Sequence, residues 1–179
     1  MRRSAVALCA VLLTFGFTTP ASAQAYLFGG GGYSVPASSF SDIADAGWMG
    51  TAGLLLPLGE GFLVGGQGYY GRNNHRTIDG ARTDLMGAMG VAYRTFGAPD
   101  GPTPFATVGA GYLRAKFQYS GSSVADSGLA ASAGIGLQVP LGSLRGFLSG
   151  AYTLGFGDLS DVRWMAVNVG IGIPLGGGM

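Results

Sequence analysis

Large apolar residues alternate with small or polar ones along residues 164–175, near the end of the chain. A period of two predicts a β-strand with one apolar face and one thin, mildly polar face. Residues 51–58 and 132–139 repeat this pattern without gaps, and residues 88–95 form a weaker copy. Between the copies lie Gly/Ala-rich runs that end in tyrosine: Tyr33, Tyr69, Tyr112 and Tyr152. Two strand types alternating four times predict four hairpins and eight strands.

The strands predicted from this alternation are long for a soluble sheet. Their expected bounds are residues 25–34, 47–58, 61–72, 83–96, 104–119, 128–141, 146–156 and 163–175. Such lengths match the roughly 9–11 residues that a tilted strand needs to cross a bilayer. Connections after even strands are short and turn-like, whereas those after odd strands, including residues 120–127, are longer or more polar. One end of the predicted sheet therefore has short turns, and the other has longer loops.

The N-terminus has the composition of a secretory signal peptide. Arg2 and Arg3 precede an apolar run, and Ala21-Ser22-Ala23 provides a small-residue cleavage site. We therefore expect two parts, a signal peptide at 1–23 and one β domain at 24–179. The run is shorter than the ~20 residues of a spanning helix, which argues against a membrane anchor.

Charge and cysteine content narrow the functional classes. Removing the two signal arginines leaves 8 of the 10 basic residues against 9 acidic ones, so no electrostatic case exists for nucleic-acid binding. The single cysteine, Cys9, lies in the signal, and the chain has one histidine. These counts support neither a disulfide framework nor a strong metal or redox motif. We expect no cofactor.

The direction of the apolar face separates a membrane barrel from a soluble lipocalin-like one, which points its apolar face inward and its charges outward. The thin face of the repeated strands carries no charge and would make a poor surface toward water. We therefore expect Val169 and Ile171 to face lipid, with Asn168 and Gly170 facing the interior. Aromatic residues at strand ends suggest two interfacial girdles. The candidates are Trp48, Trp164, Phe62, Tyr93, Phe105 and Phe147.

With these features, residues 24–179 resemble the small eight-stranded outer-membrane barrels of the OmpA transmembrane domain, OmpX and opacity-protein type. The resemblance implies an all-β, eight-stranded antiparallel up-and-down transmembrane β-barrel after a cleaved N-terminal signal peptide. It also implies location in the cell outer membrane, contact with outer-membrane lipid, and recognition of the last strand by the barrel-assembly machinery. Residues 168–175 are similar to the assembly signal of such barrels, although the chain ends in Gly-Gly-Gly-Met and not in an aromatic residue. We expect a monomer.

Three functions fit such a barrel. The first is a structural or surface-exposed role in which the external loops contact an external ligand or host surface. The second is a narrow porin-like channel for ions or small solutes, in which polar residues line the lumen or its rim. Its candidates are Arg94, Arg114, Lys116, Gln67, Gln138 and Asn168. For Arg114 and Lys116, a position at the external rim with the charge in solvent is the alternative.

The third function is modification of lipid A, which some barrels of this class perform. It would need a histidine beside a serine and a carboxylate. The chain's one histidine, His75, lies in an expected loop, and the His-x-Ser pattern of the deacylases is absent. We expect His75 to be a solvated loop residue and the protein not to be an enzyme.

Overall fold

The computed structural model describes residues 25–59, 61–97 and 100–175. The predicted signal peptide at 1–23 lies outside the described residues, as do the last four residues of the chain. In the described part, no helix is both long and apolar enough to cross a membrane.

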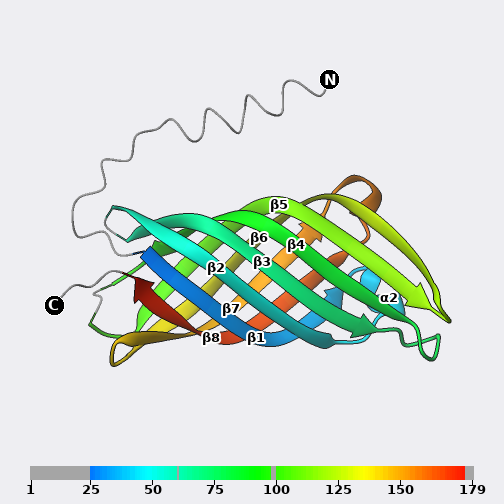
Figure 1. The fold of residues 1–179 in the computed structure, drawn as a ribbon, viewed down its shortest axis with the longest axis horizontal. Coiled ribbons are helices and arrows are strands. Elements are labelled where there is room, and N and C mark those ends of the chain that lie inside the picture. Colours follow the sequence, from blue (N-terminus) through cyan, green and yellow to red (C-terminus); the bar gives the residue numbers. More distant parts are fainter. Residues whose placement is uncertain (1–24, 60, 98–99, 176–179) are drawn as a thin grey trace, which may run out of the picture.

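Eight antiparallel strands close into one barrel in the order of the sequence, so that β1 pairs with both β2 and β8 (Figure 1). The up-and-down order predicted from the repeats is confirmed. The strands are β1 (Ala25–Ala37), β2 (Gly47–Gly59), β3 (Phe62–Asn74), β4 (Arg82–Thr95), β5 (Thr103–Tyr119), β6 (Ser122–Leu141), β7 (Leu144–Gly155) and β8 (Arg163–Leu175). Closure pairs every strand on both edges, which is what a sheet in lipid requires.

The two ends of the barrel differ. The connections β2–β3, β4–β5 and β6–β7 lie at one end, beside the start of β1 and the end of β8 (Figure 1). The other end carries the helix α2 (Phe40–Ile43) between β1 and β2, and the 3-10 helix η1 (Gly157–Leu159) between β7 and β8. Short turns face the periplasm and longer connections face outside in barrels of this kind. We refer to the two ends as the turn end and the external end.

The connection predicted at residues 120–127 is wrong in length. β5 and β6 continue to Tyr119 and Ser122 and are joined by a tight turn at Ser120 and Gly121. Both turn residues have positive φ, 47° and 84°, as a two-residue hairpin turn requires. The sequence did not reveal this part of the strand because residues 122–127 are all exposed, so that no apolar alternation marks them as a strand.

Alternation along β8 has the predicted orientation. Val169 and Ile171 point outward, with 60% and 46% of their surface exposed, whereas Asn168 is 7% exposed and faces the interior. On the outer surface, leucines, valines and isoleucines of all the neighbouring strands continue this apolar face. An apolar outer face on a closed barrel is the arrangement expected in a bilayer.

The interior is more apolar than the thin face of β8 suggests. Large side chains from β1–β5, together with Trp164 of β8, point inward and form a continuous core. Its larger members include Phe28, Met49, Leu55, Tyr69, Leu85, Met89, Leu113 and Trp164. Glycines on the neighbouring strands make room for the rings: a Cβ at Gly136 would clash with Phe105, and one at Gly170 with Phe147. The repeated Gly positions are therefore sites where an aromatic ring lies against backbone.

Candidate functional site

The three uncharged polar residues expected in the lumen have inward positions. Gln67 shares its face of β3 with the buried Tyr69, and Gln138 lines a cavity inside the barrel. Asn168 lies deeper, and its Oδ1 has no hydrogen-bond partner among the described residues. No hydrogen bond joins these three amides in the described part of the chain, and the buried core is mostly apolar.

The three cationic candidates face outward, which contradicts their placement in a cationic lumen. Arg94 lies at the turn end, with its guanidinium carbon 4.3 Å from the ring centroid of Phe62 on the outer surface. Arg114 and Lys116 occupy outward positions of β5, alternating with the buried, inward Leu113 and Ala115. The sequence reasoning left the facing of this strand open, and the structure places both cations on the outer wall near the external end.

Only two of the six predicted interfacial aromatics are exposed on the outer surface. Trp48 and Phe62 are 50% and 51% exposed. Trp164, Tyr93, Phe105 and Phe147 are core residues, so their assignment to the girdles is wrong. Trp164 has the same parity as Asn168 on β8, and the period of two already required it to point inward. The prediction gave more weight to the position of Trp164 at a strand end than to this alternation.

Sequence reasoning missed most of the actual outward aromatics near the external end. In a closed barrel, paired residues on successive strands are displaced along the barrel axis. When this displacement is taken into account, five of these aromatics lie at a common height. They are Tyr33, Trp48, Tyr70, Tyr112 and Tyr152. Three of these tyrosines end the Gly/Ala-rich runs of the sequence repeat. Such a ring of aromatics marks the external membrane interface.

The external end is closed by a cap made of the connections between the strands. Phe40 of α2, Ala44 and Leu159 of η1 are at most 3% exposed and pack onto the barrel core. The connections also bond to each other: Arg76 N donates to Ile43 O over 3.0 Å, and Ser39 Oγ lies 3.3 Å from Asp161 Oδ1. We call this assembly the external cap (residues 38–46, 75–81 and 156–162, with the tip of the β5–β6 hairpin).

A buried polar pair anchors the first connection of the cap. Asn73 and Ser34 are both fully buried, and Ser34 Oγ donates to Asn73 Oδ1 over 3.2 Å. Asn73 Nδ2 donates to the carbonyl oxygens of Ser34 and Asp45, at 3.1 and 2.8 Å. A network whose groups are satisfied fixes one arrangement of the backbone, here the path of the β1–β2 connection over β3.

A cleft of about 370 Å³ opens in the external cap. Every external connection contributes to its walls, which combine apolar and acidic side chains. The lining includes Ile43, His75, Ile78, Phe117, Val124, Asp126, Asp158 and Val162. Ile43, Ile78 and Val124 remain substantially exposed. The cap as a whole is acidic: it contains Asp42, Asp45, Asp79, Asp126, Asp158 and Asp161 against Arg76.

His75 lies in the wall of this cleft and is partly buried, not freely solvated as expected. Its Nε2 is 2.8 Å from Thr83 Oγ1, and its ring centroid is 4.9 Å from that of Phe117. Burial lowers the pKa of His75 from its ordinary value. Asp84, a candidate acid near it in sequence, instead faces the outer wall and bonds to Arg72 and Gln118. In the described part of the chain no carboxylate bonds to His75, so the His75–Thr83 contact lacks the acid that would orient the imidazole.

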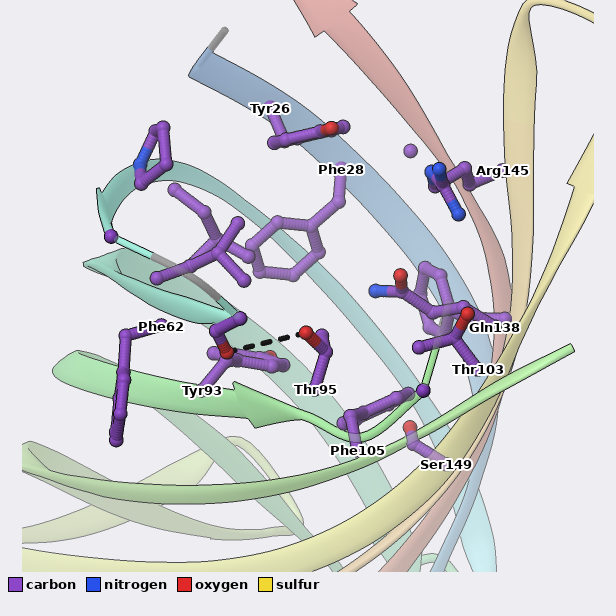
Figure 2. A pocket seen from close by; sticks show the side chains of 18 residues that line it. Tyr26, Phe28, Phe62, Tyr93, Thr95, Thr103, Phe105, Gln138, Arg145 and Ser149 are labelled. Atoms are coloured by element: carbon purple, nitrogen blue, oxygen red, sulfur yellow. Dashed lines mark hydrogen bonds between the residues drawn. The ribbon is translucent and has the colours of Figure 1, made fainter. Parts of the chain in front are cut away.

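A second cavity, of about 450 Å³, lies inside the barrel at the turn end. Figure 2 shows the rings of Tyr26, Phe28 and Phe105 around it, with Gln138 and Arg145 on one side. The apolar core separates this cavity from the external cleft. In the described part of the chain, no group of three or more His, Cys, Asp or Glu residues could hold a metal ion.

Comparisons with known proteins agree with this architecture. The family model described as "Outer membrane protein beta-barrel domain" matches residues 7–173. No curated protein sequence matches the chain.

Three solved structures are similar in fold. Neisserial surface protein A aligns with a TM-score of 0.68 at 12% identity, covering 83% of this chain and 96% of that one. Ail, the attachment invasion locus protein of Yersinia pestis, aligns with a TM-score of 0.61 at 19% identity, over 86% and 99% of the two chains. The N-terminal β-barrel domain of Pseudomonas aeruginosa OprF gives 0.57 at 18%, over 86% and 100%. At these identities the likeness concerns the fold.

Proposed function

We propose that this chain, which belongs to the outer membrane protein β-barrel domain family, uses its external cap as a binding surface. The chain is an integral outer-membrane β-barrel, so the cap faces the outside of the cell. The observation that carries the proposal is the cleft of about 370 Å³, whose walls come from all the external connections. Binding sites on rigid scaffolds concentrate in such connections.

The cap is held in shape before any ligand arrives. Phe40 and Leu159 anchor two connections in the core, and the buried Asn73 fixes the first of them. Preorganisation lowers the entropy lost on binding, because the connections need no ordering when a ligand is bound. A surface that served only to solvate the rim would not need to bury these anchors.

The chemistry of the cleft indicates its ligand class. Exposed Ile43, Ile78 and Val124 offer apolar contact, and Asp126 and Asp158 supply negative charge beside them. Complementary charge selects partners and speeds encounter. We therefore infer a peptide or protein segment that carries Lys or Arg beside apolar side chains. The neighbour Ail has been crystallised with the heparin analogue sucrose octasulfate; the acidic cap of this chain favours a ligand of opposite charge.

A peptide selection tests this directly. A displayed random-peptide library would be selected on the full-length mature barrel in lipid nanodiscs, and we expect enriched sequences to combine basic and apolar residues. Asp126→Asn with Asp158→Asn should weaken these peptides, whereas Ser123→Ala on the same hairpin serves as the matched control. Enrichment of acidic peptides, or binding unchanged in the double variant, would reject the proposal.

The other two functions have less support. The channel loses its cationic candidates because Arg94, Arg114 and Lys116 face outward. For the enzyme, His75 contacts the Thr83 hydroxyl and the Phe117 ring, but no carboxylate among the described residues bonds to it to orient the imidazole, and we infer a non-catalytic role. Unchanged lipid A masses in cells expressing wild type or His75→Ala would agree with that inference. We also propose that the mature protein is a monomer and that β8 is the strand recognised by the barrel-assembly machinery.

A further inference from the structure

Four cationic side chains gather on the outer wall of β3, β4 and β5, just outside the aromatic ring. Strand pairing puts Arg72, Asp84 and Lys116 side by side in one row. Arg82 and Gln118 pair in the next row toward the external end, and Arg114 lies in the row below. We call these six residues the wall patch. The patch contains four cations and one carboxylate, so its net charge is +3.

Asp84 organises the patch from beneath. It is only 4% exposed, and Arg72 Nε donates to its Oδ1 over 2.7 Å, while Gln118 Nε2 donates to its Oδ2 over 2.6 Å. Arg82 NH2 donates to Gln118 Oε1 over 3.0 Å, which adds a second residue of β4 to a network that already joins β3, β4 and β5. The single acid is therefore engaged by Arg72 and Gln118, and Arg82, Arg114 and Lys116 supply the excess charge.

The height of the patch is set by the aromatic residues of the same strands. On β3, Arg72 follows Tyr70 on the outward face, and Arg72 NH2 donates to the Tyr70 hydroxyl over 3.0 Å. On β5, Arg114 is the next outward residue after Tyr112. Aromatic residues mark the membrane interface, so the wall patch lies at the level of the lipid headgroups.

The patch occupies one side of the barrel. On β1 the outward residue that follows Tyr33 is Val35, and on β7 the one that follows Tyr152 is Leu154. Cationic side chains that only extend into solvent would not need to be grouped in this way, and would not need a buried carboxylate to hold them in place. Arg guanidinium groups form charge-assisted, often bidentate, bonds to phosphate, and desolvation near the membrane strengthens them.

We propose that the wall patch binds the phosphate groups of a phosphorylated glycolipid in the outer leaflet of the membrane. Arg114 and Lys116 would contact phosphate directly, and Arg72 and Arg82 would be held in place by Asp84 and Gln118. The site lies on the outer face of the strands whose inward residues Thr83, Ala115 and Phe117 line the cleft, so a lipid bound there does not occupy the cleft of the external cap.

The test compares bis-phosphorylated lipid A with the same lipid after removal of both phosphates. The mature barrel is reconstituted in phosphatidylcholine nanodiscs, and binding of each dansyl-labelled lipid is followed by energy transfer from the tryptophans. We expect wild type to prefer the phosphorylated lipid by about tenfold, equivalent to about 1.4 kcal/mol. Arg114→Gln with Lys116→Gln should remove most of this preference, and added salt should weaken it.

Arg163→Gln is the matched control, because Arg163 is an exposed cation at the same end of the barrel but on β8. It should keep the preference, and heat-modifiable migration would verify that each variant is folded. Equal binding of the two lipids by wild type would overturn the proposal, as would an equal loss in Arg163→Gln. Millimolar inorganic phosphate that abolished the preference would point to free phosphate, not lipid, and would also overturn it.

Discussion

Tyr69 of β3 and Trp164 of β8 meet inside the barrel, with ring centroids 6.0 Å apart and planes inclined by 49°. The two strands are not neighbours, so the contact spans the interior and closes it below the external cap. Trp164 is 1% exposed and Tyr69 is 9% exposed. This contact explains why the most confined tryptophan of the barrel does not serve as a membrane anchor.

Trp164→Ala should therefore destabilise the barrel strongly. Removal of a buried Trp costs about 3–5 kcal/mol, because contacts are lost and a cavity is left. Urea unfolding from phospholipid vesicles would measure the change. Trp48→Ala is the control, since Trp48 is half exposed on the outer surface and contacts Tyr70 there. A larger loss in Trp48→Ala would contradict the placement of the two residues.

The period of two was sufficient to predict the strand number, their order and the outward face of β8. It could not predict the apolar interior, because the thin face is a property of β6 and β8, whereas β1–β5 contribute rings and large aliphatic side chains. On β5, glycine and alanine occupy both faces around Tyr112, so apolarity gave no contrast from which to read the direction of Arg114. The cap cleft and the wall patch depend on strand pairing, which the sequence alone did not supply.

Arginine on the lipid face provides a test of the outer surface. Val169 is 60% exposed near the middle of β8, and Val169→Arg should cost about 2–4 kcal/mol because the charge lies in hydrocarbon. Ala125→Arg introduces the same side chain at an exposed position of the β5–β6 hairpin that pairs with Lys116 at the external interface, where the cost is about 0–1 kcal/mol. Refolding titrations in vesicles compare the two. Equal costs would mean that Val169 does not face lipid.

The single histidine gives the cap a pH dependence. Burial lowers the folded-state pKa of His75 below its ordinary value of 6.5, so the unfolded connection takes up a proton first as the pH falls. The contribution of neutral His75 to cap stability is thus complete above about pH 6.5 and decreases as the pH falls through the lowered pKa. The imidazole proton signal of the nanodisc sample should titrate below pH 6.5. A midpoint above that pH would place His75 in a different environment.

Planar-bilayer recording should find no stable channel. Leu85 and Leu113 are fully buried in the interior, and Trp164 packs across it against Tyr69. An interior of eight strands has room for side chains and little more. Stable, uniform conductance steps would contradict this packing. Because Arg114 and Lys116 lie on the outer wall, Arg114→Gln with Lys116→Gln should leave the recording unchanged.

The glycines opposite aromatic rings should be the least replaceable residues in the strands. A Cβ on the inward Gly170 would overlap the ring of Phe147 and the backbone of Gly29, and neither the ring nor a hydrogen-bonded strand can move away freely. Gly29 itself faces outward, and a Cβ there would meet nothing closer than Thr51 O at 3.9 Å.

Gly170→Ala should accordingly lose about 1–3 kcal/mol through overpacking. Gly29→Ala should be neutral or slightly stabilising, by up to about 1 kcal/mol, because alanine restricts the unfolded chain. Both residues lie in the middle of adjacent strands, so differences in membrane depth or strand propensity do not separate them. Urea unfolding of the two variants in the same vesicles would compare them. Equal effects would mean that the ring of Phe147 does not prevent a side chain at Gly170.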